Sequence, residues 1–295
     1  MIKDGQILVE RYQYDRKPMD RLTSNSMAKS LIYRHRVRAV GRADPLAARP
    51  GPRVRKGNVY GETKIRSLLR MGSGARFTEE NLGGNDGAFA QLHGTKGSIA
   101  AIRAFNTREA PEGERFHYAS IETQVLTVVL RAATRKSVPD YLADRLWRPM
   151  GAEADATWIT GPDDIERGAA FFNATLRDWG RLGRLLAGDG ALDGTQIIPR
   201  DYLLDATDWH RHPKALAPKA LPPANGYGFH FWTMRGDRRR FLMRGVYGQA
   251  IYVDPELHLA LVHTAVAKTA SISDQPMGAE LGALWLGLVS TFGRW

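Results

Sequence analysis

Apolar and polar positions alternate near both ends of the chain, and this period of two predicts strands. Ile7 and Val9 alternate with polar neighbours after a Lys3-Asp4-Gly5 turn, which predicts the second arm of a hairpin. Beyond Gly226 we predict four more strands, in the stretches "YGFHFWTM", "RRFLMRGVYG", "QAIYVDP" and "LHLALVHTAV".

Between these ends, apolar residues recur every three to four positions, a spacing typical of helices. Ile65, Leu68 and Leu69 have this spacing, and "SIETQVLTVVLRAAT" predicts a longer helix with Ser120 as its N-cap. Further helices are predicted at "PDYLADRLW", "DWGRLGRLLA" and "GAELGALWLGLVSTF".

The order of these elements predicts an α+β fold. Strands at both chain ends would form one mainly antiparallel sheet with flanking helices, and a largely helical domain would be inserted between them. We predict the sheet domain over 1–30 and 188–295 and the helical domain over 31–187.

Composition limits the classes of protein to consider. A chain of 295 residues with 43% hydrophobic content can bury a large core. It has no cysteine, which removes disulfides, thiol catalysis and Cys-ligated metals. It has no run of 18 apolar residues, and its first residues include acidic side chains where a signal peptide would be apolar. We therefore expect no membrane association, and the cytoplasm is the default location.

The net charge of +11 suggests nucleic acid as a partner, but the charge is concentrated in one segment. Residues 31–56 hold seven Arg, one Lys and one Asp, or +7, which leaves an ordinary +4 elsewhere. Neither zinc-finger spacing nor an aromatic nucleic-acid motif accompanies it. Nucleic-acid binding is therefore a minor hypothesis.

Ser26-Met27-Ala28-Lys29 is the first candidate for catalytic chemistry. Residues three apart on a helix share a face, so Lys29 could take the proton of the Ser26 hydroxyl. At a helix N-terminus, the Ser26 amide N–H is also able to bind an oxyanion. On its own this pair is a weak signal.

Two further motifs follow in order along the chain. Tyr118-Ala119-Ser120 lies directly before a predicted helix; its Tyr hydroxyl could relay a proton and Ser120 could extend the hydrogen-bond network. In Gly245-Val246-Tyr247-Gly248-Gln249, Gly248 would let the backbone approach a ligand and the Gln249 N–H could be a second oxyanion donor. Taken singly, the first could be a buried Tyr beside a capping Ser and the second a strand with a bulge.

Together, the three motifs resemble those of the serine β-lactamase and penicillin-binding superfamily. The resemblance is closest to its class C-like esterase and amidase branch, which includes the 6-aminohexanoate-dimer hydrolases, and it extends over most of the chain outside 31–56. It implies a β-lactamase/transpeptidase-like fold and an acyl-enzyme formed on Ser26, with Lys29 and Tyr118 moving protons and no cofactor. The expected partner is a small ester or amide.

Departures from the family pattern refine this expectation. β-Lactamases have Lys-[Ser/Thr]-Gly at the third motif, whereas this chain has Val246-Tyr247-Gly248, which favours ester or linear-amide substrates. Lys268-Thr269-Ala270 lacks the glycine and is interpreted as unrelated. Members of this branch carry more chain before the first hairpin, so we expect an N-terminal part to be missing. D-Alanyl-D-alanine carboxypeptidase or penicillin-binding activity, and a non-catalytic binding protein, are the alternatives.

Other catalytic or metal-binding arrangements have less support. His210 and His212 lack a third ligand with metal-site spacing, so we interpret them as solvated loop residues. A Ser-His-Asp triad is possible in principle, but the chain has no G-x-S-x-G elbow. No metal is therefore expected.

The segment 31–56 conflicts with the resemblance. In this family the helix carrying Ser and Lys continues through an apolar face, whereas here Arg stands at 34, 36, 38 and 42. Burying one unpaired charge costs several kcal/mol, comparable to the total stability of a domain. We therefore hypothesise two compensating frame shifts, in the gene or in its sequencing, which could leave the chain as written inactive. The alternative is a solvated basic loop after a shortened helix.

The coding DNA tests this hypothesis. Translation of the 31–56 region in one of its other two frames is expected to give an apolar helix, and the chain as written is expected to express poorly and hydrolyse little. If neither frame encodes an apolar helix, the basic loop is the correct interpretation.

Overall fold

The computed structural model describes residues 1–32, 57–79, 92, 94, 96–219, 225–273 and 275–293. These form two compact units, each built from separate segments of the chain. Unit 1 comprises 1–27, 143–157 and 172–295, and unit 2 comprises 28–142 and 158–171. Most of the segment 31–56, including the positions with the unexpected arginines, lies outside the described residues.

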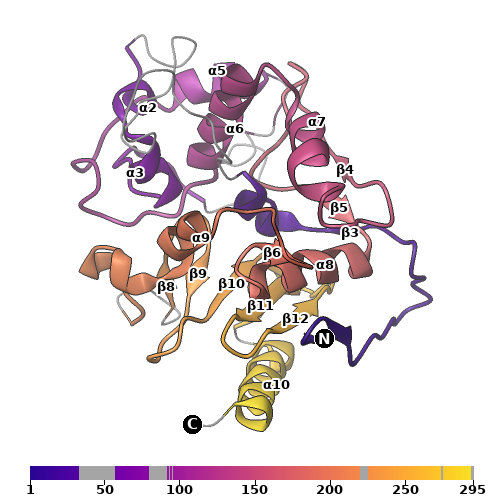
Figure 1. Cartoon of the computed structure of the whole chain (residues 1–295). Helices are drawn as coiled ribbons and strands as arrows, with labels where there is room; N and C mark the ends of the chain where they lie inside the picture. Colours follow the sequence, from indigo (N-terminus) through magenta and orange to yellow (C-terminus); the bar gives the residue numbers. More distant parts are fainter. Residues whose placement is uncertain are drawn as a thin grey trace. The chain divides into compact units, whose positions relative to one another are not determined.

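Unit 1 contains a seven-stranded antiparallel sheet in the order β2-β1-β12-β11-β10-β9-β8. The hairpin of β1 (Ile2–Lys3) and β2 (Gln6–Ile7) pairs with β12 (Leu259–His263), so the first and last strands are neighbours (Figure 1). The remaining strands are β8 (Gly226–Tyr227), β9 (Trp232–Thr233), β10 (Phe241–Arg244) and β11 (Ala250–Asp254). The predicted α+β fold, with a sheet built from both chain ends, is confirmed.

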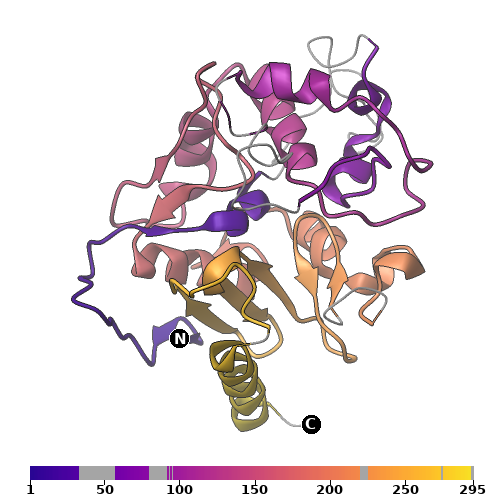
Figure 2. The same cartoon turned by 180° about the vertical axis from the view of Figure 1, so that it is seen from behind.

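Helices cover both faces of this sheet, because successive residues of β12 point to opposite sides. Helix α8 (Leu176–Ala187) packs on one face, where a Cβ added to Gly183 would lie 3.0 Å from Ala260 Cβ. Leu259 and Leu261 point to the other face and contact α10 (Pro276–Phe292). The views from two sides in Figure 1 and Figure 2 show α8 and α10 flanking the strands.

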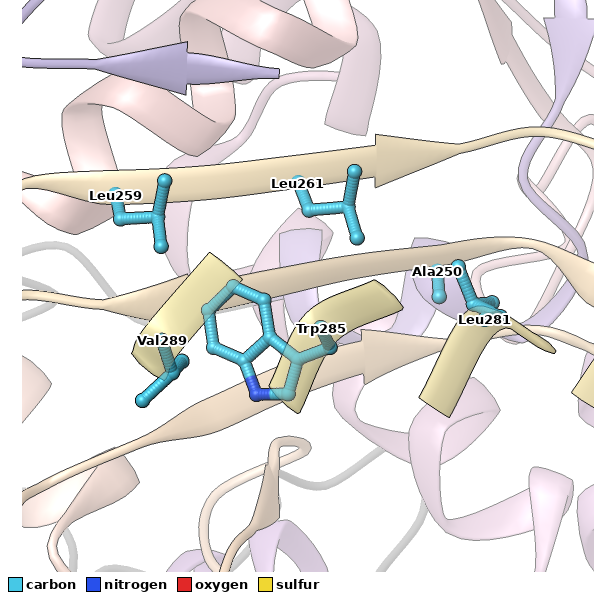
Figure 3. Close-up of a cluster of buried hydrophobic side chains, with 6 residues drawn as sticks. All are labelled: Ala250, Leu259, Leu261, Leu281, Trp285 and Val289. Atoms are coloured by element: carbon cyan, nitrogen blue, oxygen red, sulfur yellow. The ribbon is translucent and has the colours of Figure 1, made fainter. Parts of the chain in front are cut away.

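The core beneath α10 is a compact apolar cluster around Trp285. Figure 3 shows this side chain between the strands and the helix, together with its buried neighbours Ala250, Leu259, Leu261, Leu281 and Val289. Tyr252 adds a tilted ring contact to Trp285, with 5.3 Å between ring centroids. Truncating a buried Trp typically costs about 3 to 5 kcal/mol, so this cluster is a main anchor of α10.

Shorter elements complete unit 1. They are β3 (Leu22–Thr23), η3 (Ala143–Trp147), β5 (Phe172–Ala174), β6 (Ala191–Leu192), β7 (Thr195–Gln196), α9 (Arg200–Thr207), η4 (Trp209–Arg211), η5 (Lys214–Leu216) and η6 (Val246–Gly248). Strand β4 (Thr157–Trp158) and η1 (Asn25–Leu31) each straddle a division between the units.

The grouping of segments differs from the predicted domain boundaries. We placed 143–157 and 172–187 in the helical domain, whereas the structure groups both with the sheet. The reason is that α8 packs on β11 and β12, and the buried Asp178 at its start accepts hydrogen bonds from the backbone N–H groups of Glu153 (2.9 Å) and Ala154 (3.2 Å). These contacts were not readable from periodicity.

The strand predicted at "YGFHFWTM" is a hairpin of two short strands instead. Between β8 and β9, the N–H of Phe229 donates to the carbonyl of Ala206 (3.0 Å) and His230 has a left-handed φ of 59°. A long-range contact with α9 therefore interrupts the strand, even though the apolar alternation continues through it.

Unit 2 is mainly helical. Its helices are α2 (Val59–Glu62), α3 (Ile65–Leu69), α5 (Ser98–Ala104), α6 (Ser120–Thr134) and α7 (Val138–Leu142). Helix α6 is the central one, contacting α3, α5 and α7. One detail of the prediction was wrong: Ala119, not Ser120, is the N-cap, because the Ser120 side chain bonds to Glu79 instead of capping the helix.

Glu122 is a buried carboxyl group on α6, with 1% of its surface exposed. Its Oε1 accepts from the Ser73 hydroxyl (2.7 Å) and the Ser73 N–H (3.2 Å), while no described residue contacts Oε2 by a hydrogen bond. Desolvation raises the pKa of Glu122 from 4.5 to about 8, against the opposing effect of the bonds from Ser73. Glu122 is therefore a neutral acid at moderate pH.

A raised carboxyl pKa predicts the direction of a pH effect on stability. Between about pH 4.5 and pH 8 the unfolded chain releases the Glu122 proton and the folded chain keeps it, so the free energy of unfolding falls as pH rises. The side chain of the Glu122→Gln variant does not titrate, so its free energy of unfolding lacks this decrease. Relative to the wild type, the variant is expected to become more stable by up to roughly 4 kcal/mol across that range. Denaturant unfolding of both proteins between pH 5 and pH 8 measures the difference. A difference that is constant with pH would contradict the prediction.

Candidate functional site

Helix η1 carries the first predicted motif on a well-anchored backbone. Ser24 directly precedes it and exchanges two hydrogen bonds with Phe172, from Ser24 N to the carbonyl (2.7 Å) and from Phe172 N to the Ser24 hydroxyl (3.1 Å). Residues three apart eclipse in a 3₁₀ helix, so Ser26 and Lys29 lie on one side of η1. Met27 and Ala28 between them are fully buried, and Leu31 and Ile32 behind them are buried as well.

The third predicted motif forms a tight connection between β10 and β11. Its ends are joined by a hydrogen bond from Gly245 N to the Gln249 carbonyl (2.8 Å). Within it, Tyr247 (φ 62°) and Gly248 (φ 95°) have left-handed backbones. The φ of Gly248 favours glycine, and a Cβ there would also lie 3.1 Å from both Ala265 Cβ and Met277 Sδ, a tight contact.

Asn25 brings the first and third motifs together within unit 1. Its side-chain amide donates to the Val246 carbonyl (3.1 Å) and to Gln249 Oε1 (2.8 Å). Gln249 in turn donates from its own amide to the Ala265 carbonyl. The turn is therefore tied to the residue immediately before Ser26.

Lys29 and Tyr118 lie together within unit 2. Lys29 is 2% exposed, and its Nζ lies 4.9 Å from the centroid of the Tyr118 ring. The same Nζ donates to the Ala169 carbonyl at 3.0 Å. A backbone carbonyl thus fixes the ammonium group beside the tyrosine that the second motif predicts.

The loop that carries Ala169 is held by Gln124 of α6. The Gln124 amide donates to the Glu166 carbonyl (2.7 Å) and to the Ser98 hydroxyl (2.9 Å), and its oxygen accepts from Gly168 N (3.0 Å). Gly168 is also too close to Thr127 for any larger residue, since an added Cβ would lie 1.9 Å from Thr127 Oγ1. Gln124 therefore fixes the loop whose carbonyl binds Lys29.

Ser120 makes hydrogen bonds to a residue that the sequence did not indicate, and its predicted part in the network of Ser26, Lys29 and Tyr118 stays a prediction. The Ser120 hydroxyl and backbone N–H both reach the carboxylate of Glu79, the latter at 3.1 Å. Asn25, Gln124, Ala169 and Glu79 were all missed, because their contacts join segments far apart in the chain.

The remaining sequence candidates contact other residues of unit 1. His210 lies beside Asp208, with 3.0 Å between Nδ1 and Oδ1, and the His212 ring packs edge-on against Phe229 at 5.3 Å. Lys268-Thr269-Ala270 follows β12, and the Ala270 carbonyl accepts from Tyr247 N (2.9 Å). In the described part of the chain, no three His, Asp or Glu side chains are grouped to hold a metal ion. None of the described helices has the length and apolar composition that crossing a bilayer requires.

Comparisons with known proteins indicate the family and the fold of the chain. Residues 43–276 match the family model described as Beta-lactamase. The 6-aminohexanoate-dimer hydrolase of Paenarthrobacter ureafaciens is 22% identical over 281 residues, which cover 89% of this chain and 70% of that protein.

Two solved structures show the same fold. "Putative 6-aminohexanoate-dimer hydrolase from Bacillus anthracis" superposes with a TM-score of 0.82 at 22% identity, covering 99% of this chain and 79% of the other. A family VIII carboxylesterase superposes with a TM-score of 0.63 at 16% identity, covering 89% and 82%. The predicted β-lactamase/transpeptidase-like fold is confirmed.

The close approach of the third motif to the nucleophile segment can be tested at Gly245. Its φ of −120° suits any residue, but an added Cβ would lie 2.5 Å from the Ser24 carbonyl oxygen. Gly245→Ala is therefore expected to lower the free energy of unfolding by about 1 to 3 kcal/mol through displacement of this contact. Denaturant unfolding measures the change.

Gly282→Ala is the matched control, because a Cβ at this position in α10 meets nothing within 4 Å. Alanine is the better helix former, so this variant is expected to be neutral or more stable by up to about 1 kcal/mol. Equal stability of the two variants would show that the contact at Gly245 is unimportant.

Proposed function

The chain belongs to the beta-lactamase family, and on this premise we propose that it is a serine hydrolase that cleaves esters or linear amides through an acyl-enzyme on Ser26. One observation carries the proposal: the first and third motifs are grouped within unit 1, and Lys29 and Tyr118 are grouped within unit 2. Asn25 ties the 245–249 turn to the residue before Ser26, and Lys29 lies against Tyr118. Helix η1 carries Ser26 and Lys29 together.

In the proposed first step, the Ser26 hydroxyl attacks the substrate carbonyl. Its proton passes to the pair of Lys29 and Tyr118, and Tyr118 then delivers a proton to the departing alcohol or amine. The fixed contact of Lys29 with the Ala169 carbonyl supports this role, because it holds the amine in one orientation. The negative charge that develops on the carbonyl oxygen is stabilised by the N–H groups of Ser26 and Gln249.

The second step reverses the same proton movements. Water attacks the acyl group on Ser26 while Tyr118 and Lys29 accept its proton, and Ser26 recovers a proton as the carboxylic acid leaves. These steps need no cofactor. Asn25, which holds the 245–249 turn, and Gln124, which holds the loop that binds Lys29, would act through the catalytic side chains.

The proposed substrate class rests on the third motif and on the relatives. Val246 stands where β-lactamases have the lysine that binds the carboxylate of the drug, so the site has no such cation at this position. Relatives named as a 6-aminohexanoate-dimer hydrolase and a carboxylesterase support linear amides and esters as substrates.

Removing the nucleophile tests the proposal. Ser26→Ala is expected to abolish hydrolysis of a short p-nitrophenyl ester, because no acyl-enzyme can form. Ser30→Ala, on the same helix but outside the proposed machinery, is the control and is expected to keep the activity. Turnover by Ser26→Ala equal to that of the wild type would overturn the assignment.

Labelling experiments separate the proposed function from its alternatives. A fluorophosphonate is expected to modify the folded wild-type protein at Ser26, located by mass spectrometry of the digest. A folded protein that is not labelled would be a non-catalytic binding protein instead. Stable labelling by a penicillin would indicate a penicillin-binding or D-alanyl-D-alanine carboxypeptidase activity.

A further inference from the structure

The peptide bond between Gly248 and Gln249 is held by a side chain that the proposed mechanism does not use. His263, near the end of β12, lies with Nδ1 at 2.7 Å from the Gly248 carbonyl oxygen. A carbonyl oxygen can only accept a hydrogen bond, so Nδ1 is the donor. The neutral ring therefore carries its hydrogen on Nδ1, and a doubly protonated ring would make the same bond.

This contact determines where the next N–H points. In a trans peptide the C=O of one residue and the N–H of the following residue are antiparallel and lie in one plane. Fixing the Gly248 oxygen toward His263 therefore directs the Gln249 N–H to the opposite side. That N–H is the proposed second donor to the oxyanion.

Among the described residues, His263 is the group that bonds directly to this peptide. Within the described part of the chain, no other donor bonds to the Gly248 oxygen, and the Gln249 N–H bonds to no protein acceptor. Gln249 is nevertheless 2% exposed, so its N–H is a buried donor without a partner among the described residues. Such a donor is costly unless a ligand satisfies it, as an oxyanion would.

Gly248 cannot set this plane by its own preference. Its φ of 95° lies in a region where glycine has wide conformational freedom, so the peptide after it needs an external contact to adopt one orientation. The bonds of the Gln249 side chain to Asn25 and Ala265 hold the side chain and do not involve the peptide.

We propose that His263 is a positioning residue that orients the Gln249 N–H toward the oxyanion by holding the Gly248 carbonyl. The inference rests on the proposed serine-hydrolase function and adds a residue to it. His263 acts through the peptide and does not touch the substrate. Its loss would weaken binding of the charge that develops in the transition state more than binding of the substrate itself.

The test compares two amides at position 263. The side-chain nitrogen of Asn is separated from Cβ by the same number of bonds as His Nδ1, whereas that of Gln is one bond further away. His263→Asn is therefore expected to keep kcat for a p-nitrophenyl ester within about threefold of the wild type, whereas His263→Gln and His263→Leu lose about 10- to 100-fold with little change in KM. Thermal midpoints confirm that each variant is folded.

His210→Leu is the matched control, because it removes a half-exposed histidine of the same unit that bonds only to nearby Asp208. It is expected to leave kcat unchanged. If His263→Leu does not fold, the comparison of Asn with Gln decides the question without it.

The outcomes separate the two levels of inference. Equal kcat for His263→Asn and His263→Gln in an active protein overturns the role of His263 and leaves the serine-hydrolase function intact. A folded wild-type protein that neither hydrolyses the ester nor reacts with a fluorophosphonate at Ser26 overturns the proposed function and, with it, this inference. Loss of kcat in His263→Gln but not in His263→Asn supports the proposed role of His263.

Discussion

The hydrogen bonds made by the side chain of Asn25 are the constraint on which the geometry of unit 1 around Ser26 depends. They join the start of η1 to Val246 and Gln249, which lie more than 220 positions further along the chain. Asn25 also has a left-handed φ of 41°, a conformation that asparagine tolerates better than most residues. One residue type thus serves both the backbone turn into the helix and the link to the third motif.

A buried amide has the corresponding role in unit 2. Gln124 holds the 166–168 backbone with one donor hydrogen and its oxygen, and its other hydrogen bonds to the Ser98 hydroxyl. The next residue, Ala169, binds Lys29. A fully satisfied polar network of this kind rigidifies a core, whereas a partly satisfied one is costly. The lysine of the first motif is therefore positioned by α6, the same helix that follows Tyr118.

The periodicity of the sequence was sufficient for most of the fold, because amphipathic helices and buried strands are local patterns. It failed where distant contacts decide the structure. The backbone of Phe229 bonds to α9 and divides one predicted strand into two, and Ser120 bonds to Glu79 instead of capping α6. A sequence pattern carries no signal for such partners.

In the candidate site, too, local patterns were predicted and distant contacts were not. The spacing and order of the motifs indicated Ser26, Lys29 and Tyr118, and the structure groups Lys29 with Tyr118 as that interpretation requires. The residues that fix these groups could not be found in this way. The Ala169 carbonyl is a backbone atom, which any residue could supply, and it lies 140 positions from Lys29. Catalysis by these groups stays a prediction.

The left-handed turn at Tyr247 and Gly248 persists because packing elsewhere offsets the free-energy cost of its backbone conformation. A non-glycine residue in this conformation costs of order 1 kcal/mol, and it persists only where its surroundings fix it. Tyr247 exchanges backbone hydrogen bonds with Ala267 and Ala270, and Gly248 lies against Met277 of α10. Helix α10 is in turn anchored on the sheet by the cluster around Trp285. Apolar burial under α10, at residues with no chemistry of their own, therefore contributes to holding the proposed oxyanion turn, together with the hydrogen bonds of Asn25 and Tyr247.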